Sequence, residues 1–278
     1  MVEQPRDTAR ASGENVVART HVARHRLGVP SELIAVVPAA GRGARLGIDT
    51  PKVFAELRPG VRVWDVLLRR LATVTDHVHL VLSEEGVAFF DRLGRPSLDA
   101  VTVTVSCQPA PRGMGDAVLG AIEHWRAAHD IVILWGDQLG LRAETLARTV
   151  AAQREAPVPA LTLPLVQTRA PYVHYDLDAR GTLQRVLQAR EGDSCPAHGL
   201  SDVGLFALST AGLEPAWKRY VATAEARGAI TGELNLLPFF AFLSREGAHS
   251  TRVVPVRDAD EARGINTPED LAWFRARS

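Results

Sequence analysis

The sequence has little cysteine, no long apolar run and no net charge, and each shortage excludes a class of protein. Lys+Arg and Asp+Glu each number 32 in 278 residues, so the overall charge favours neither nucleic acid nor a membrane surface. No apolar run approaches the roughly 20 residues of a membrane-spanning helix. Residues 1–17 also lack the apolar core of a signal peptide. Cys107 and Cys195 are far apart in the sequence and form no Cys-x-x-Cys pair, so we expect two free thiols in a cytoplasmic protein.

The composition is that of an ordinary globular domain, with 46% hydrophobic and 23% charged residues. Residues 1–31 are polar, Arg-rich and without a sustained period, and they predict a flexible arm. Residues 32–278 are expected to form one domain with a small lobe.

Short apolar runs alternate with helical periodicity in the first half of this domain, which is typical of βαβ units on a parallel sheet. The expected strands are 33–37, 77–82, 101–105 and 131–135, and the expected helices are 63–74, 86–93, 115–129 and 143–155. Loops at the carboxyl ends of such strands carry function.

The second half contains more strands and fewer helices. Its expected strands are 160–166, 172–177, 183–188, 203–208 and 251–256, and its expected helices are 211–226, 233–245 and one from Pro268. The whole pattern predicts an α/β fold with a Rossmann-like, doubly wound, mixed but mostly parallel sheet.

A glycine-rich loop follows the first strand, in "VVPAAGRGARLGIDTPKVF" (36–54). A dinucleotide-binding fingerprint would need glycine at Leu46, and a P-loop would need glycine where Pro51 precedes Lys52. Neither motif is present. Glycine backbone N–H groups can still cradle phosphates, while Arg45 offers a planar fork and Lys52 a compact charge.

This string resembles the signature of the nucleoside triphosphate transferases that make nucleotide sugars. It is nearest to N-acetylglucosamine-1-phosphate uridylyltransferases, and Pro38–Ala40 is also similar to the methylerythritol-phosphate cytidylyltransferases. The resemblance covers about residues 33–276 and is patchy after the first half. It implies a nucleotide-binding half (32–158), an acceptor-binding half (159–250) and a closing strand, metal ligand and helix (251–278).

The resemblance also implies roles for residues of the loop. Arg45 would hold the departing pyrophosphate, and Lys52 would lie near the reacting phosphorus. The remaining nucleotide-binding residues of the loop would be Ala39 and Ala40 at the base and ribose, and Gly41, Arg42 and Gly43 at the phosphates.

In "CQPAPRGMGDAV" (107–118), Gln108 and Gly113 match the spacing at which the family reads the base. Met114 replaces a usual Thr, and Asp116 stands where His is often found, so the base is left open.

Asp137 ends the apolar run "IVILWGD" (131–137), where an acidic side chain is well placed for Mg²⁺. A helix-capping role is the simpler alternative. By resemblance, Asp137 is both catalytic and a metal ligand, and Asn266 is the second ligand. Thr267 and Pro268, which follow it, form a competent helix start.

The acceptor residues implied by the resemblance are Tyr172, Gln188, Asp202 and Gly204. Val173 stands where the family has glycine, Gln188 where it has Glu, and "SDVG" (201–204) where it has Asn-Thr-Gly. These departures predict an acceptor other than N-acetylglucosamine 1-phosphate.

The predicted function is Mg²⁺-dependent transfer of a nucleoside monophosphate from a nucleoside triphosphate to a small phosphorylated acceptor, such as a sugar 1-phosphate, with release of pyrophosphate. The alternatives are a cytidylyltransferase acting on a non-sugar phosphate or phosphonate, a molybdenum-cofactor nucleotidyltransferase, which shares the "NTPEDL" ending, and a catalytically silent nucleotide-binding relative. Whether the chain forms a homodimer is left open.

Overall fold

A computed structural model describes residues 32–277, except 42, 44, 45, 157 and 158. The arm expected over residues 1–31 therefore lies outside the described residues. Strands are β1 (Leu33–Pro38), β2 (Glu56–Arg58), β3 (Val61–Arg62), β4 (His77–Leu82), β5 (Thr102–Cys107), β6 (Asp130–Leu134), β7 (Ala160–Arg169), β8 (Val173–Leu177), β9 (Leu183–Gln188), β10 (His198–Asp202), β11 (Leu205–Ser209) and β12 (Ser250–Val256).

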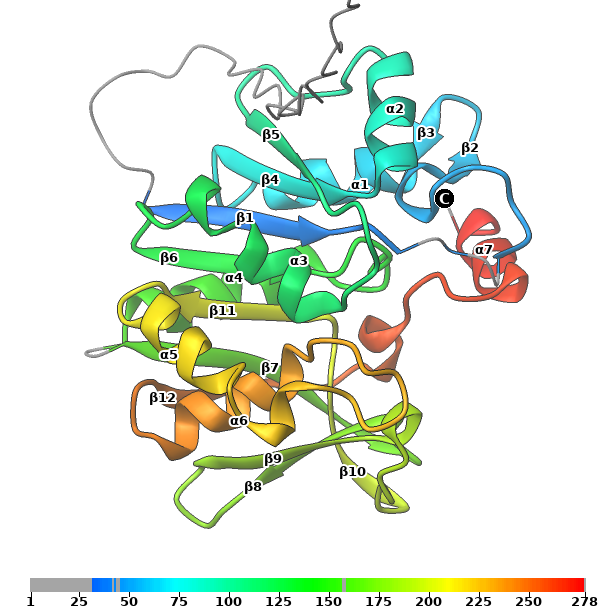
Figure 1. The fold of residues 1–278 in the computed structure, drawn as a ribbon. Coiled ribbons are helices and arrows are strands. Elements are labelled where there is room, and N and C mark those ends of the chain that lie inside the picture. Colours follow the sequence, from blue (N-terminus) through cyan, green and yellow to red (C-terminus); the bar gives the residue numbers. More distant parts are fainter. Residues whose placement is uncertain (1–31, 42, 44–45, 157–158, 278) are drawn as a thin grey trace, which may run out of the picture.

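Eight of these strands form one central sheet in the order β10-β7-β11-β6-β1-β4-β5, with β12 paired to β7 (Figure 1). β6, β1, β4 and β5 run parallel, as does β12 beside β7, whereas β10 and β11 are antiparallel to their neighbours. The predicted α/β fold with a mixed sheet is confirmed. The hairpins β2–β3 and β8–β9 stand apart from this sheet.

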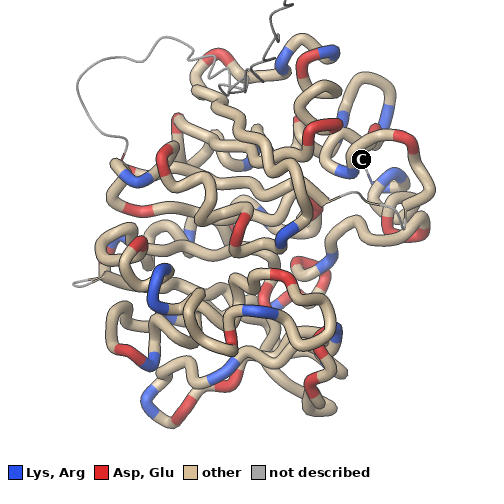
Figure 2. The backbone as a smooth tube through the Cα atoms, in the orientation of Figure 1, with Lys and Arg blue, Asp and Glu red and all other residues tan. Residues whose placement is uncertain are grey.

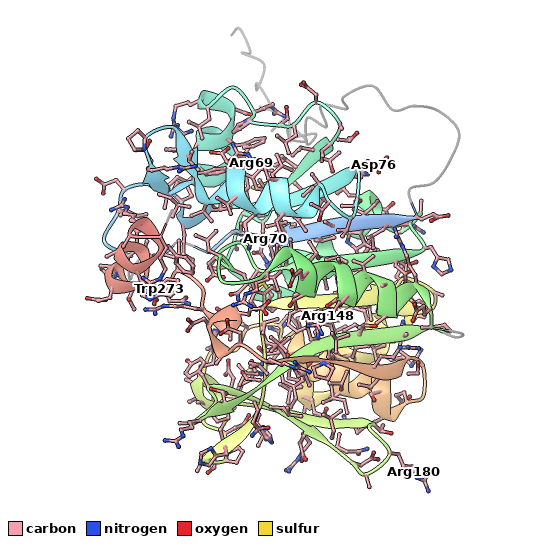
Figure 3. All side chains as sticks on the ribbon, turned by 180° about the vertical axis from the view of Figure 1, so that it is seen from behind. Arg69, Arg70, Asp76, Arg148, Arg180 and Trp273 are labelled. Carbon is pink, nitrogen blue, oxygen red and sulfur yellow. The ribbon has the colours of Figure 1, made fainter. Side chains whose placement is uncertain are left out.

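The α-helices are α1 (Val63–Leu71), α2 (Glu84–Arg92), α3 (Met114–Gly120), α4 (Ala143–Arg154), α5 (Leu213–Tyr220), α6 (Leu237–Arg245) and α7 (Pro268–Arg275). Helices α3, α5 and α6 cover one face of the sheet (Figure 1), and α1 and α4 cover the other (Figure 3). The sheet therefore forms the middle layer of three, as in doubly wound folds.

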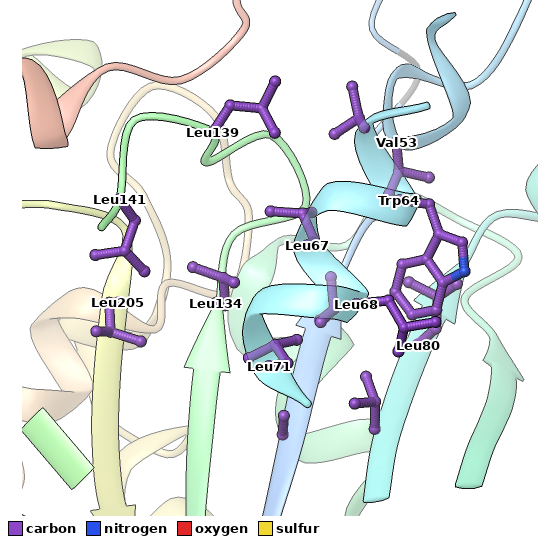
Figure 4. Close-up of a cluster of buried hydrophobic side chains, with 14 of the residues drawn as sticks. Val53, Trp64, Leu67, Leu68, Leu71, Leu80, Leu134, Leu139, Leu141 and Leu205 are labelled. Carbon is purple, nitrogen blue, oxygen red and sulfur yellow. The ribbon is translucent and has the colours of Figure 1, made fainter. Parts of the chain in front are cut away.

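β1 is buried along its whole length because both faces of the sheet are covered. Its side chains alternate between two hydrophobic clusters, with Ala35 and Val37 in one and Ile34 and Val36 in the other. In the first cluster the buried side of α1 packs on β1, β4 and β6 (Figure 4).

Several elements differ from the predictions. The helix expected over 211–226 ends at Tyr220, the one expected over 233–245 begins at Leu237, and β2 and β3 were not predicted. The helix expected over 115–129 stops at Gly120 and tightens into a 3-10 turn, η3 (Ile122–His124), because the buried Trp125 folds back to donate a hydrogen bond to the carbonyl of Val118 at 3.0 Å. β10 was not predicted; it pairs with the far end of β7 and extends the sheet toward the β8–β9 hairpin.

Charge is evenly distributed over the fold. Segments of both signs are interspersed along the tube in Figure 2, in keeping with the balanced composition. Within the described residues, no helix is both long and apolar enough to cross a membrane. Cys107 and Cys195 are free thiols, as predicted.

Candidate active site

Three predicted residues meet at the carboxyl edge of the parallel strands. The ammonium Nζ of Lys52 lies 2.5 Å from Oδ2 of Asp137 and donates to Oδ1 of Asn266 at 3.3 Å. The side chains of Lys52 and Asp137 are 20% and 18% exposed, so the pair lies at the wall of the site and solvent reaches it. The structure thus brings one cation and two side-chain oxygens to one point.

Lys52 is held by the short 3-10 turn η2 (Lys52–Phe54), which follows Pro51 and buries Val53 and Phe54 in the core. The glycine loop passes directly against it. This position favours glycine for two reasons: a Cβ on Gly43 would lie 3.1 Å from Cβ of Lys52, and the φ of Gly43 is +60°. Arg42 and Arg45, the other predicted phosphate-binding cations, lie outside the described residues.

The loop after β6 sets the position of Asp137. Gly136 allows this loop to touch the glycine loop, since a Cβ there would lie 2.7 Å from Cβ of Ala39. From the other side, the guanidinium of Arg70 on α1 donates to the carbonyls of Gln138 and Leu139 (Figure 3). Burial lowers the pKa of Arg70, while the charge of Glu261 opposes that shift. Arg70 was not predicted as a site residue, because only the packing of α1 shows what it contacts.

Asn266 reaches Asp137 through the segment that follows β12. The N–H of Ile265 donates to the backbone carbonyl of Asp137 at 2.9 Å. A Cβ on Gly264 would lie 3.1 Å from that same oxygen, so the two segments run close together.

The segment is then anchored by the start of α7. Oδ2 of Asp270 accepts the N–H groups of Asn266 and Thr267, and Thr267 caps the helix in return through its hydroxyl. The capping role of Thr267 and the placement of Asn266 beside Asp137 therefore coexist.

The predicted base-reading residues lie at the same edge, on both sides of the end of β4. The N–H of Ala39 donates to Val81, and the N–H of Gln108 donates to Leu82. Ala40 is buried and Gly41 is exposed beside them. The amide nitrogen of Gln108 donates to the carbonyl of Gly113 at 3.1 Å and to Oδ2 of Asp116 at 2.8 Å.

Asp202 and Gly204 lie beside the loop of Asp137. The φ of Gly204 is +72°. A Cβ there would lie 2.9 Å from the side chain of Gln138 and 3.0 Å from that of Trp135. Asp202 accepts hydrogen bonds from the hydroxyl of Tyr175 at 3.2 Å and the N–H of Gly204 at 2.8 Å. Burial raises the pKa of Asp202, the charge of Asp137 adds to the rise, and the two hydrogen bonds oppose it.

Tyr172 and Gln188 lie farther out, at the end of the β8–β9 hairpin. Tyr172 is 60% exposed, and its carbonyl accepts the N–H of Ala189, whereas Gln188 is buried. No hydrogen bond in the described part of the chain joins either residue to Lys52 or Asp137.

Glu191 is near Gln188 but does not replace the family's glutamate as a free acceptor. Its carboxylate, whose side chain is 4% exposed, accepts the N–H groups of Ile230 and Thr231 and the Thr231 hydroxyl. Burial alone would raise the pKa of Glu191, but these hydrogen bonds and the charge of Arg190 outweigh it and lower the pKa.

The donor set suits Mg²⁺. Between residues 32 and 277, outside the gaps, no group of three or more His, Cys, Asp or Glu side chains is arranged to hold a metal ion. Mg²⁺ does not need one, because it binds through one or two protein oxygens together with waters and substrate phosphates. Asp137 and Asn266 already direct two oxygens at one cation, the Lys52 ammonium.

Comparison with known proteins places this geometry in a family. Residues 35–201 match the MobA-like NTP transferase domain. The chain is 31% identical over 245 residues to the bifunctional protein GlmU of Anaeromyxobacter sp. (strain Fw109-5), covering 87% of the chain and 48% of GlmU. The chain thus spans about half the length of this relative.

Solved structures share the fold at low sequence identity. HddC from Yersinia pseudotuberculosis, solved alone and complexed with GMP-PN, superposes with a TM-score of 0.60 at 17% identity, covering 88% of this chain and 98% of that chain. The 4-diphosphocytidyl-2C-methyl-D-erythritol synthase from Anaerococcus prevotii DSM 20548 has a TM-score of 0.56 at 12% identity, covering 90% of this chain and 99% of that one.

Proposed function

Because the chain belongs to the MobA-like NTP transferase domain family, we propose that it transfers a nucleoside monophosphate from a nucleoside triphosphate to a small phosphorylated acceptor and releases pyrophosphate. The observation that carries the proposal is the contact of Lys52 with both Asp137 and Asn266 at the end of the parallel strands. The complex of HddC with GMP-PN supports a nucleotide as ligand.

The reaction in this proposal is an in-line displacement. A phosphate oxygen of the acceptor attacks the α-phosphorus, and the bond to the β-phosphate oxygen breaks, so pyrophosphate leaves with the electron pair. Such a transfer needs positioning and charge neutralisation more than a protein nucleophile. Lys52 stabilises the negative charge that develops on the α-phosphate oxygens, and Arg45 and the glycine loop hold the leaving phosphates.

Asp137 and Asn266 are the residues that would hold Mg²⁺. The ion supplies Lewis-acid stabilisation of the phosphates and a template that aligns the two substrates. The Lys52 ammonium occupies the meeting point of the two oxygens in the present arrangement. In this proposal it moves from Asp137 to the nucleotide phosphates when substrate and metal bind.

The acceptor belongs on the side of Asp202, Gly204 and Tyr172. We keep the division into a nucleotide-binding half (32–158), an acceptor-binding half (159–250) and a closing segment (251–278) as part of the proposal. It is supported by Gly204, two residues after Asp202, where an added Cβ would lie 2.9 Å from the side chain of Gln138, the residue next to Asp137. A sugar 1-phosphate or a comparable phosphorylated compound is the acceptor class proposed.

The test is pyrophosphate release in the presence of Mg²⁺, with UTP, dTTP, CTP, GTP and ATP each combined with sugar 1-phosphates, polyol phosphates, phosphocholine and simple phosphonates. Lys52→Ala serves as the inactive comparison, and Lys218→Ala as the matched control, since Lys218 is an exposed lysine that pairs with Glu214 one helical turn away. Turnover by the wild type and the control, but not by Lys52→Ala, supports the proposal.

The remaining outcomes separate the alternatives. Turnover restricted to CTP with a non-sugar phosphate or phosphonate identifies the cytidylyltransferase alternative. Nucleotide binding without turnover on any acceptor indicates a binding protein. Absence of nucleotide binding would overturn the assignment of the glycine loop.

A further inference from the structure

The amide of Gln108 is fixed in one orientation. Gln108 follows β5, and its side-chain nitrogen Nε2 makes two hydrogen bonds, to the carbonyl of Gly113 and to the carboxylate of Asp116. A carbonyl and a carboxylate only accept hydrogen bonds, so the atom that faces them must be the NH₂ group. The usual ambiguity between the two ends of a glutamine amide does not arise here.

The carbonyl oxygen Oε1 of Gln108 is therefore the end that remains for a ligand. In the part of the chain that the structure describes, the one buried side-chain nitrogen or oxygen without a hydrogen-bond partner is Nδ1 of His249. Within the described residues no hydrogen bond is donated to Oε1 of Gln108, whose residue is 8% exposed.

Gln108 lies at the edge of the sheet where we place the base of the nucleotide. Gln108 and Ala39 are bonded to adjacent residues, Leu82 and Val81, at the end of β4. In the proposed function the nucleotide phosphates lie on the glycine loop, and we place the base beside Gln108, as the resemblance implies.

We propose that Asp116 is a specificity-determining positioning residue: it holds Gln108 so that only a hydrogen-bond acceptor faces the base. The base that binds must then carry an N–H donor at this point, and a base that lacks that donor leaves Oε1 unpaired. Sites built around a specific hydrogen bond discriminate strongly against an analogue that cannot form it. This inference rests on the proposed function for the identity of the ligand.

Loss of the Asp116 carboxylate should release the amide. In Asp116→Leu the Gly113 carbonyl is the one remaining acceptor for Nε2, and the amide can rotate to present its NH₂ group to the ligand. Asp116→Asn also removes the negative charge but keeps an oxygen that accepts from Nε2. This variant therefore tests whether the hydrogen bond or the charge of Asp116 holds the amide. Glu123→Leu, at an exposed acidic residue of η3, is the matched control.

The experiment measures equilibrium binding of nucleotides by their displacement of a fluorescent nucleotide. The parent ligands are UTP, CTP, GTP and ATP. Each is compared with a partner methylated at the N–H groups of its pairing edge: N3-methyl-UTP, N4,N4-dimethyl-CTP, N1-methyl-GTP and N6,N6-dimethyl-ATP. For the base that binds best, we expect methylation to weaken binding by the wild type, Asp116→Asn and Glu123→Leu at least tenfold. In Asp116→Leu the same ratio should fall below about threefold.

Two results would overturn the inference: wild-type protein that binds the methylated partner as well as the parent, or Asp116→Leu that keeps the wild-type ratio. Because the readout is binding, it separates the two proposals. A chain that selects among bases but releases no pyrophosphate supports the role of Asp116 and refutes the transfer reaction. If pyrophosphate is released but the ratio of parent to methylated binding is the same in Asp116→Leu as in wild type, the transfer reaction is supported and the role of Asp116 is refuted.

Discussion

Lys52 and Asn266 are 214 positions apart in the sequence, yet the ammonium of Lys52 donates to the amide oxygen of Asn266 at 3.3 Å, with Asp137 at 2.5 Å on its other side. Their meeting depends on the carbonyl of Asp137, which accepts the N–H of Ile265, the residue before Asn266. One loop thus supplies a carboxylate to the site and fixes the segment that supplies the amide.

Replacing Lys52 by Ala should reduce kcat/KM by about 10²–10³, the usual effect of removing one group that stabilises transition-state charge. The free energy of unfolding should change by less than about 1 kcal/mol, because a partly exposed ion pair contributes little. Steady-state kinetics and urea unfolding measure the two effects. Full activity in Lys52→Ala would contradict the role given to it.

Replacing Asp137 by Asn should raise the Mg²⁺ concentration needed for half-maximal activity. The variant keeps an oxygen at the same place but loses the charge that attracts a hard cation. Binding of Mn²⁺ alone, followed by its electron paramagnetic resonance signal, gives a readout that does not depend on turnover. Equal Mn²⁺ affinity in wild type and Asp137→Asn would exclude Asp137 as a ligand.

Gly113→Ala should weaken nucleotide binding by displacing the turn that holds Gln108. The φ of Gly113 is +109°, and an added Cβ would lie 2.5 Å from the carbonyl oxygen of Leu234, so the turn must shift. We expect a strain of about 1–3 kcal/mol and a higher KM for the nucleotide. Gly120→Ala, where no atom lies within 4 Å of the new Cβ, is the control and should leave KM unchanged.

Glu191→Gln should destabilise the segment that connects the two halves of the site. Glu191 holds Ile230 and Thr231, while Leu234, a few residues on, exchanges backbone hydrogen bonds with Arg112 and Gly115. The loss should be about 1–3 kcal/mol of unfolding free energy, as for a hydrogen-bonded buried charge. Hydrogen exchange at residues 228–235 should accelerate, and the exposed Glu246→Gln provides a comparison without effect.

Stability should decrease as the pH falls below about 6.5, because His79 is buried between the hydroxyls of Thr104 and Ser106 and stacks on His124. Burial is the largest cause of a pKa of about 3 for His79, and the nearby charges of His124 and His77 contribute to the same lowering. The unfolded chain takes up the proton from pH 6.5 downward and the folded chain does not, so the folded state loses about 1.4 kcal/mol per pH unit in this range.

At pH 5 this loss amounts to about 2 kcal/mol from His79 alone. Urea unfolding at pH 7 and pH 5 should therefore show a smaller difference in His79→Gln than in wild type. The exposed His198→Gln is the control. An unchanged difference in His79→Gln would mean that His79 does not carry the pH dependence.

Three strands of the parallel half, β1, β4 and β6, were predictable because they are buried almost throughout and rich in apolar residues. β1, β4 and β6 begin and end within one residue of the predicted ranges. β10 could not be predicted in the same way, since "HGLSD" is mostly polar and becomes a strand only through its pairing with β7.

The residues of the candidate site also fall into those that the sequence could predict and those that it could not. Lys52, Asp137 and Asn266 belong to short motifs that could be read from the chain, and the structure brings them together, although their roles remain predictions. The partners of Arg70, Glu191 and Asp116 depend on which segments pack against them. Asp116 was noted only as a departure from the family, and its contact with Gln108 gives that departure a physical meaning.

The attachment of Asn266 to the loop of Asp137 also has a consequence for biosynthesis. A ribosome releases the segments that carry Lys52 and Asp137 well before the segment around Asn266. The nascent sheet can therefore assemble while one of the two oxygens proposed to bind the metal has yet to be translated. In the proposed function such an intermediate would lack Asn266, so it would hold Mg²⁺ less well than the complete chain.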